Sequence, residues 1–300
     1  MDYDAVIVGG SYAGLAAATQ LARARRSVLV VDGGRRRNRF AEHSHGFLTQ
    51  DGAAAGAIVA EGRRQLLAYE TVRWLDGEVV DARPSDGAFR LVLDDMTSIQ
   101  ARRIVLATGV VDVLPDLPGL ADRWGRRVFH CPYCHGYELD RGRIGVLGVS
   151  SLSLHQALML PDWGPTTLFL HDACEPNREQ RAQLEARGVK VEAARVRYID
   201  GDLDLHLEDG RLARLDGLFV ATRIQPASPL AQQLGCEVEE SVLGRTIKTD
   251  AMKATAVPGV YACGDLARPG GSVAAAVGDG TLAGAAAHQS LIFAGLSHAQ

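Results

Sequence analysis

The feature that most constrains the fold is a glycine-rich turn after the first apolar segment. Residues 5–8 are apolar and of strand length, and a helical stretch runs to Ala24 after the turn Gly9-Gly10-Ser11-Tyr12-Ala13-Gly14. A second apolar segment, 27–31, ends at Asp32. In such a unit, the first glycine makes the turn, the last lets helix and strand pack closely, and the helix N–H groups meet a pyrophosphate. The order predicts a dinucleotide-binding unit in which Asp32 accepts the ribose hydroxyls.

The middle of this turn departs from the usual pattern. Ser11 stands where a second glycine normally lets the backbone approach the phosphate. Serine is small, however, and its hydroxyl can donate a hydrogen bond to phosphate. A glycine pattern alone is weak evidence, but the preceding strand and a correctly placed acid strengthen it. The alternative is an ordinary glycine-rich turn between a strand and a helix.

Strand-length apolar runs alternate with longer helical stretches along the chain. The runs stand at 5–8, 27–31, 104–107, 144–147 and 167–170. This alternation predicts an α/β fold around largely parallel sheets. Because a second strand–turn–helix begins at Gly148, we expect two Rossmann-like three-layer lobes. Proline-containing connections at 113–119 and 225–229 predict that the second lobe is inserted into the first.

Composition narrows the classes of partner. The chain is 47% apolar and carries 32 Lys and Arg against 36 Asp and Glu, a net charge of -4. That balance gives no general attraction to nucleic acid or to anionic lipid. The sequence begins without the basic stretch of a signal peptide, and charged and glycine residues interrupt the alanine-rich tail. We expect a cytoplasmic protein, bound to neither nucleic acid nor membrane, with small-molecule or protein partners.

Two of the five cysteines, Cys131 and Cys134, stand close together. Half of a zinc site is one interpretation, but zinc needs two further ligands at suitable spacing, and the sequence has no second C-x-x-C. We therefore predict no metal site. The alternative is a redox pair, in which one sulfur attacks as thiolate and the other resolves the mixed disulfide.

The residues around the pair suit thiol chemistry. Pro132 fits the first turn of a helix, which places Cys131 near a helix N-terminus, where a thiol pKa is lowered. His135 follows Cys131 by four residues and would share its helical face, placed to relay a proton. Glu138 follows His135 by three residues and is placed to orient it. Gly136 weakens a long helix, so these offsets require only that the first turn forms.

The chain resembles the two-dinucleotide-fold flavoproteins, specifically the low-molecular-weight thioredoxin reductase family. The resemblance is carried by Gly264-Asp265 after an apolar strand, by Ala107-Thr108-Gly109, and by the early C-x-x-C in the inserted lobe. It implies an FAD-binding domain of residues 1–113 and 224–300, with an inserted NAD(P)-binding-like domain at 114–223 that carries the cysteines.

The same resemblance assigns roles to residues. In that family the Gly-Asp pair binds the ribityl-pyrophosphate part of FAD and the Ala-Thr-Gly strand end lies beside the cofactor. The expected FAD contacts are Gly9, Gly10, Ser11, Tyr12, Ala13, Gly14, Asp32, Gly33, His45, Gly46, Val80, Ala107, Thr108, Gly109, Gly264, Asp265, Val273 and Ala274.

The redox motif Cys131-Pro132-Tyr133-Cys134-His135-Gly136-Tyr137-Glu138 has its own implications. By resemblance Cys134 faces the flavin and Cys131 exchanges with substrate, while His135 stands where the family has an acidic aspartate. The C-P-x-C-H-G-x-E form is similar to a branch that includes gliotoxin- and holomycin-type dithiol oxidases and atypical thioredoxin reductases.

The second lobe departs from the family pattern. Ser150 occupies the middle glycine position of the turn that begins at Gly148. The family's His-Arg-Arg, which holds a 2′-phosphate, is replaced by His171-Asp172-Ala173. An aspartate repels a 2′-phosphate, although it suits the ribose diol of NADH. We therefore expect no efficient use of NADPH.

Three functions remain open. The favoured one is an FAD-dependent dithiol oxidase that moves electrons from a substrate dithiol through Cys131 and Cys134 to FAD and then to O2. The second is an NAD(P)H-dependent thioredoxin-disulfide reductase. The third is a flavin redox sensor without turnover. The expected partner is a small-molecule dithiol or disulfide or a thioredoxin-like protein, and by resemblance the protein is a homodimer.

Overall fold

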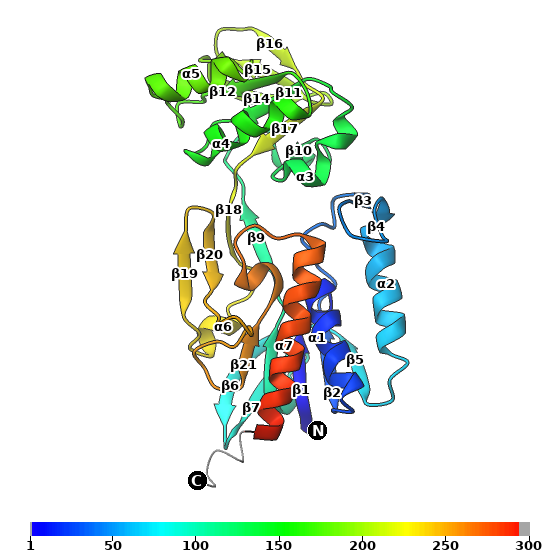
Figure 1. Ribbon diagram of the computed structural model, residues 1–300. Coiled ribbons are helices and arrows are strands. Elements are labelled where there is room, and N and C mark those ends of the chain that lie inside the picture. Colours follow the sequence, from blue (N-terminus) through cyan, green and yellow to red (C-terminus); the bar gives the residue numbers. More distant parts are fainter. Residues whose placement is uncertain (1, 294–300) are drawn as a thin grey trace. The chain divides into compact units, whose positions relative to one another are not determined.

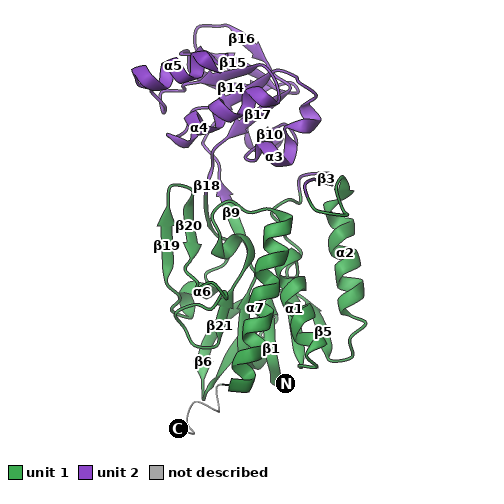
Figure 2. Cartoon of the chain, viewed as in Figure 1, with its two compact units in different colours: residues 1–39, 47–111, 224–300 green, residues 40–46, 112–223 purple. Residues whose placement is uncertain are grey.

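The computed structural model describes residues 2–293, which form two compact units (Figures 1 and 2). Unit 1 comprises 1–39, 47–111 and 224–300, and unit 2 comprises 40–46 and 112–223. The predicted domains differ in two places, because segment 40–46 and residues 112–113 group with unit 2. Residues 1 and 294–300 of the predicted FAD domain lie outside the described part of the chain.

Unit 1 is built on a seven-stranded sheet in the order β5-β2-β1-β8-β7-β6, with β21 also pairing with β8. Five of its strands run parallel: β1 (Asp2–Val8), β2 (Val28–Asp32), β5 (Val72–Asp76), β8 (Ser98–Leu106) and β21 (Val260–Ala262). The hairpin β6 (Val79–Ser85) and β7 (Ala88–Leu93) adds antiparallel strands beside the first half of β8. The parallel strands end at one edge, where α/β sheets bind nucleotides.

Helices α1 (Tyr12–Arg23) and α7 (Val273–Phe293) lie side by side in unit 1 (Figure 1). Their contact depends on small residues, because a Cβ on Gly280 would lie 2.0 Å from the carbonyl oxygen of Ala13, and one on Gly284 would lie 2.4 Å from that of Ala17. The two helices and α2 (Ala55–Leu66) share a core with the parallel strands. A second core contains the β6–β7 hairpin and α6 (Leu230–Gln233).

Two smaller sheets contain strands of unit 1 together with strands of the segments that connect it to unit 2. One sheet has the order β19-β20-β18-β9, and another pairs β3 with β4. Because β9 and β18 are hydrogen-bonded neighbours, the chain enters and leaves the 112–223 part of unit 2 along two adjacent strands. The bounds are β3 (His43–Ser44), β4 (Ala53–Ala54), β9 (Val110–Val113), β18 (Arg223–Pro226), β19 (Val238–Ser241), β20 (Gly244–Ile247) and η4 (Gly264–Ala267).

Unit 2 has a parallel sheet of its own in the order β10-β17-β11-β12-β13. Its strands are β10 (Val128–Phe129), β11 (Ile144–Leu147), β12 (Thr166–Phe169), β13 (Lys190–Glu192) and β17 (Gly217–Val220). An antiparallel sheet contains β14 (Val196–Asp200), β15 (Asp204–Leu207) and β16 (Leu212–Arg214). The helices are η1 (Ala121–Arg123), α3 (Pro132–His135), η2 (Tyr137–Leu139), α4 (Leu152–Met159), η3 (Leu160–Asp162) and α5 (Arg178–Ala186).

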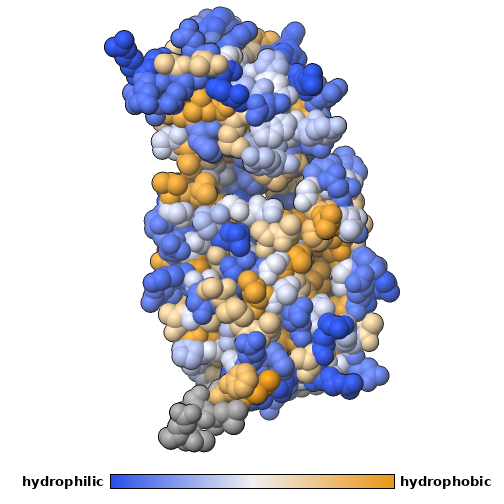
Figure 3. Space-filling model, in the orientation of Figure 1, coloured by the Kyte–Doolittle hydropathy of each residue, from blue (hydrophilic) through white to orange (hydrophobic). Residues whose placement is uncertain are grey.

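The predicted α/β class is confirmed, since each unit contains a parallel sheet with helices. Apolar runs 144–147 and 167–170 match β11 and β12 to within one residue. Figure 3 shows apolar side chains among polar ones over unit 1, and the exposed apolar residues of α7 include Leu282 and Ile292. None of the helices between residues 2 and 293 is long and apolar enough to cross a membrane.

Candidate active site

Three parallel strands of unit 1 end together at the predicted dinucleotide turn. The Ala107 N–H donates to the carbonyl oxygen of Val8 at 2.8 Å, and the Cys263 N–H donates to that of Leu106 at 3.0 Å. A Cβ on Gly9, whose φ is +102°, would lie 2.4 Å from the carbonyl oxygen of Ala107. The ends of β1, β8 and β21 are therefore in direct contact, which brings together three predicted groups: Gly9–Gly14, Ala107–Gly109 and Gly264–Asp265.

Glycines let the backbone of this turn pack closely, and among the described residues no side chain caps the first amides of the helix that follows. A Cβ on Gly14 would lie 1.8 Å from the carbonyl oxygen of Gly9, so helix and strand approach as closely as a glycine allows. The N-cap residue Ser11 makes no side-chain cap within residues 2–293, and the first turn of α1 contains no acidic residue. The first amides of α1 are thus left to a bound anion.

Asp32 lies where a ribose acceptor is expected. Its Oδ1 accepts the N–H of Gly10 at 3.0 Å, which leaves Oδ2 to accept a ribose hydroxyl. A Cβ on Gly33 would lie 3.1 Å from the side chain of Glu78, so the segment before β6 lies beside Gly33. Val80 is on β6 and is 45% exposed.

Buried polar atoms without partners stand in the loop after β2. Nε of Arg36 and Oδ1 of Asn38 are buried and have no hydrogen-bond partner within the described residues. Nδ2 of Asn38 donates to the Tyr12 hydroxyl at 3.0 Å, which ties this loop to the dinucleotide turn. Since a buried polar group without a partner costs about 1–3 kcal/mol, these atoms indicate a polar ligand. With the open amides and the glycine cradle, the residues fit the predicted FAD.

Asp265 has a partner that sequence reasoning missed. Nη1 of Arg37 donates to Oδ2 of Asp265 at 2.9 Å, and both side chains are mostly buried. The sequence signal was the run of arginines after Asp32, which reads equally well as a solvated loop. The guanidinium of Arg37 therefore holds the carboxylate of Asp265 in place, beside the end of β21.

A buried ion cluster supports the first half of α7, which begins at the predicted contacts Val273 and Ala274. Asp279 is 2% exposed and pairs with Lys253 at 3.0 Å and Arg268 at 2.8 Å. Although burial acts to raise it, the hydrogen bonds from Arg268 and Lys253 hold the pKa of Asp279 below its ordinary value. A buried carboxylate with two cationic partners fixes this part of the helix.

The predicted redox pair in unit 2 is a disulfide. Cys131 and Cys134 are joined, with their Cα atoms 5.4 Å apart. Cys131 is the N-cap of α3 and Pro132 is the first helical residue, as the sequence predicts. Both cysteines are half-buried. A short helix that begins at Pro132 thus presents both sulfurs together.

His135 is held neutral beside the disulfide. Its ring stacks on Phe129, with ring centroids 4.4 Å apart and an interplanar angle of 21°. Burial, and then the charge of His45, lower the pKa of His135 to about 4. The imidazole is therefore uncharged at neutral pH and ready to accept a proton.

Glu138 pairs with His45 in the structure, whereas the sequence suggested that it orients His135. Nδ1 of His45 lies 3.4 Å from Oε1 of Glu138, and both belong to unit 2. His45 and Gly46 were predicted at the flavin; in unit 2, segment 40–46 brings His45 to the redox helix.

Two further side chains around the redox helix have no signal in the sequence. Trp163 stands edge-on to Tyr133, with ring centroids 5.4 Å apart, and a Cβ on Gly136 would lie 2.7 Å from its ring. Gln156 is 8% exposed, and its Nε2 donates to the carbonyl oxygen of His130 at 2.7 Å. Both come from residues 22 or more positions after Cys134, so only the fold reveals them.

The second glycine turn, in unit 2, is capped by its own serines. The N–H of Val149 donates to Oγ of Ser153 at 3.0 Å, and that of Leu152 donates to Oγ of Ser150 at 3.3 Å. Ser153 is fully buried and its Oγ also donates to the carbonyl oxygen of Leu147 at 3.1 Å. The Val149 amide is thus engaged by a side chain as that of Gly10 is in unit 1, and the difference from α1 is the first-turn amide of Leu152, which is also engaged.

The segment after β12 contains Asp172, the acidic residue that the sequence places where the family has arginine. Asp172 follows β12, and Nε of Arg195 lies 4.0 Å from its carboxylate. Burial, followed by the charge of Arg195, lowers the pKa of His171 below its ordinary value. The positive charge of Arg195 near this turn is therefore balanced by the carboxylate of Asp172.

The remaining cysteines are buried thiols. Burial raises the pKa of Cys174 and of Cys236, and raises that of Cys263 to about 12. Thiols of this kind are unreactive at neutral pH. Within residues 2–293 no group of three or more His, Cys, Asp or Glu side chains is placed to hold a metal ion.

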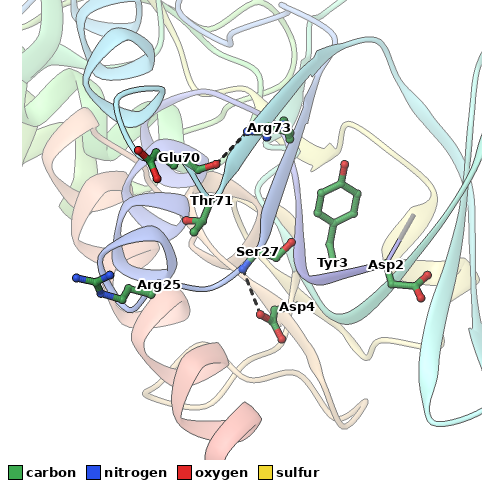
Figure 4. Close-up of a pocket in the computed structure, with 8 residues that line it drawn as sticks. All are labelled: Asp2, Tyr3, Asp4, Arg25, Ser27, Glu70, Thr71 and Arg73. Carbon is green, nitrogen blue, oxygen red and sulfur yellow. Dashed lines mark hydrogen bonds between the residues drawn. The ribbon is translucent and has the colours of Figure 1, made fainter.

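An open hollow of about 470 Å³ lies at the amino ends of β1, β2 and β5 (Figure 4). It is lined by Asp2, Tyr3, Asp4, Arg25, Ser27, Glu70, Thr71 and Arg73. Asp4 accepts the N–H of Ser27 at 3.1 Å, and Arg73 donates to the carbonyl oxygen of Glu70 at 3.0 Å. The hollow contains none of the predicted site residues and is at the strand ends opposite the dinucleotide turn.

Known proteins are similar to this chain in sequence and in fold. A family model described as "Pyridine nucleotide-disulphide oxidoreductase" matches residues 3–280. Thioredoxin reductase sirT from Leptosphaeria maculans is 32% identical over 308 residues, covering 94% of this chain and 92% of that protein. The crystal structure of the oxidoreductase from Agrobacterium tumefaciens shares 55% identity over 98% of this chain and 99% of that one, with a TM-score of 0.96. The structure of HlmI shares 37% identity over 99% and 94% of the two chains, with a TM-score of 0.90.

Proposed function

The chain belongs to the pyridine nucleotide-disulphide oxidoreductase family, and on that basis we propose that it is a dithiol oxidase with O2 as the electron acceptor. It is an FAD-dependent oxidoreductase that acts on sulfur groups, and the resemblance to the thioredoxin reductase family is confirmed. The proposal concerns the direction of electron flow: a substrate dithiol supplies the electrons through Cys131 and Cys134.

The observation that carries the proposal is the contrast between the two glycine turns. The first amides of α1 in unit 1 carry no side-chain cap, which suits the pyrophosphate of FAD. In unit 2 the N-cap residue of α4 also makes no side-chain cap within the described residues, but the first-turn amide of Leu152 is bonded to Oγ of Ser150 and the preceding Val149 amide to Oγ of Ser153. A nicotinamide dinucleotide would have to break those bonds, and Asp172 would repel a 2′-phosphate. One dinucleotide per chain is therefore favoured, without NADPH as donor.

The residues divide the reaction between them. A substrate thiolate attacks Sγ of Cys131, Cys134 leaves as thiolate, and the neutral imidazole of His135 accepts the thiol proton. The second substrate thiol then displaces Cys131, which releases the substrate disulfide and leaves a dithiol on the enzyme. A bound FAD would supply the two-electron acceptor for this dithiol and the route for the electrons to O2. The sum is a dithiol plus O2 giving a disulfide plus H2O2.

The residues proposed to hold FAD are those of the cradle. The α1 amides and Ser11 bind the pyrophosphate, Asp32 binds the adenosine ribose, and Asp265, held by Arg37, binds the ribityl-pyrophosphate part. Gly9, Gly14 and Gly264 are needed because a side chain at any of them would collide with neighbouring atoms.

Anaerobic titration of the oxidised enzyme, followed by its visible flavin spectrum, tests the direction. We expect dithiothreitol to bleach the flavin within the time of mixing and NADPH or NADH to leave it oxidised. On admission of air, one H2O2 should form for each dithiol consumed. The control is Cys134→Ser, which keeps FAD but should lose bleaching by dithiol.

Rapid bleaching by NADPH would contradict the oxidase and support an NAD(P)H-dependent thioredoxin-disulfide reductase. Bleaching by dithiol without repeated turnover in air would support a redox sensor instead. Turnover with thioredoxin rather than with a small dithiol would move the substrate from the small-molecule class to the protein class.

We also propose that the enzyme is a cytoplasmic homodimer. Three buried free thiols suit a reducing compartment. Leu282 and Ile292 are apolar side chains of α7 that are 39% and 41% exposed, and the homodimer itself is carried over from the family resemblance.

A further inference from the structure

Segment 40–46 supplies a histidine to the redox helix. This segment groups with unit 2, although the chain on either side of it belongs to unit 1. Within unit 2, Nδ1 of His45 lies 3.4 Å from Oε1 of Glu138, which follows His135 by three residues. The charge of His45 also acts on His135. Three titratable side chains, His45, His135 and Glu138, therefore form one cluster at the disulfide.

Thiol exchange loads this cluster with protons. Each substrate thiol gives up one proton when its sulfur attacks: the first attack breaks the Cys131–Cys134 bond, and the second breaks the mixed disulfide. Two electrons pass to the cysteine pair and two protons pass to the site. A substrate dithiol and the enzyme disulfide become a substrate disulfide and an enzyme dithiol, so atoms and electrons balance without another reactant.

His135 is suited to passing protons on and unsuited to storing them. It stacks on Phe129, and burial lowers its pKa to about 4. At neutral pH an imidazole of this kind holds a proton only briefly. A second proton acceptor beside His135 would therefore take up the proton that His135 cannot retain.

We propose that His45, paired with Glu138, is a positioning residue that takes the proton from His135 during thiol exchange. Nδ1 of His45 lies 3.4 Å from Oε1 of Glu138, so the carboxylate can hold the imidazole in place beside the redox helix. The pair is within reach of water, with side-chain exposures of 22% for His45 and 40% for Glu138, so the proton can leave to solvent.

Among the described residues, three titratable side chains are placed near His45. They are Glu138 from η2, His135 from α3, and His43 from the same segment, whose ring centroid lies 6.5 Å from that of His45. His43 is exposed and lies two residues before His45 in the same segment, which provides a matched control. The inference rests on the proposed function, since it assumes exchange at Cys131 and Cys134.

The test measures exchange at the cysteines themselves. The FAD-loaded enzyme is mixed anaerobically with dithiothreitol between pH 5 and 9 and quenched with N-ethylmaleimide, and alkylated Cys131 and Cys134 are quantified by mass spectrometry. We expect His45→Ala to slow exchange at pH 7 by about 10-fold or more and to alter the pH profile. Glu138→Gln should alter the same limb of the profile, His43→Asn should match wild type, and added imidazole should restore the His45→Ala rate.

A wild-type pH profile in His45→Ala would overturn the inference, as would an equal loss in His43→Asn. Loss of rate that imidazole does not restore would assign His45 a structural role and overturn it too. Failure of the proposed function gives a different result, in which exchange at the cysteines is normal but the flavin stays oxidised. A wild-type disulfide that dithiothreitol does not reduce would overturn both.

Discussion

At the scale of single residues, the chemistry of the redox site depends on side chains that suppress or supply charge. His135 is the clearest case. Its position in the sequence predicts a base, whereas its pKa depends on the residues that surround it in the fold. Phe129 covers the ring, and burial removes the solvent that would stabilise an imidazolium. The result is a histidine that is neutral throughout the physiological range.

This burial predicts a pH dependence of stability. An exposed histidine titrates near pH 6.5, whereas His135 in the folded protein has a pKa of about 4. Between these values the unfolded chain binds more protons, so the free energy of unfolding should fall by up to about 3 kcal/mol as pH decreases from 6.5 to 4, with no change from this group above 6.5. Urea unfolding across this range is the measurement. His135→Asn should flatten the slope.

The residues that the sequence located and those it did not differ in a simple way. Cys131, Cys134 and His135 stand in one motif, and Gly9 to Gly14 stand in another, so short-range spacing was enough to find them. Arg37, Gln156 and Trp163 act through partners that are 228, 26 and 30 positions away in the chain. Such contacts depend on the strand order of each sheet, which local patterns do not encode.

At the scale of elements, the redox helix is held by a close contact rather than by its own length. Helix α3 has four residues, too few to be stable alone. It ends at Gly136, whose missing side chain admits the ring of Trp163. The helix therefore takes its position from the residue that follows η3, and not from helix propensity.

Replacing this glycine tests the contact. In Gly136→Ala the new Cβ would lie 2.7 Å from both Cδ1 of Trp163 and the carbonyl oxygen of Pro132. Because the rigid backbone oxygen cannot give way freely, we expect a loss of about 1–3 kcal/mol in the free energy of unfolding. Gly278→Ala is the control: that Cβ meets no atom within 4 Å in α7, and alanine should gain about 0.5–1 kcal/mol there. Equal effects of both substitutions in urea unfolding would contradict the steric account.

Element by element, the parallel strands were the most predictable part of the fold. Apolar runs buried on both faces stand out in the sequence, as β1, β2 and β11 show. The antiparallel strands β6, β7, β14 and β15 were missed, because their alternating exposed residues leave short and weakly apolar patterns. The grouping of segment 40–46 with unit 2 was also missed, since it reflects long-range contacts.

At the scale of the whole molecule, each unit has hydrophobic cores of its own. Two core clusters lie in unit 1 and two in unit 2, and none among the described residues draws members from both. Units with separate cores can unfold separately. A ligand that binds one of them stabilises that one directly.

Removal of FAD should therefore act on unit 1 alone. At a concentration 100 times its Kd, FAD should add about 2.7 kcal/mol to the free energy of unfolding of the unit that binds it. Hydrogen exchange measured by mass spectrometry, with and without FAD, should show the gain in β1, α1 and β8 and not in β14 and β15. Equal protection of the antiparallel sheet of unit 2 would show that the two units unfold as one.

Residues 112–223 of unit 2 are joined to unit 1 through the neighbouring strands β9 and β18, beside which Oγ1 of Thr222 donates to Oδ1 of Asp112 at 2.9 Å. The inserted chain therefore leaves its host and returns to it at nearly the same point. For the sheet that contains β9 and β18, residues 112–223 are equivalent to a long loop between adjacent strands. A redox module attached in this way can be exchanged or diversified during evolution while the flavin-binding framework keeps its register.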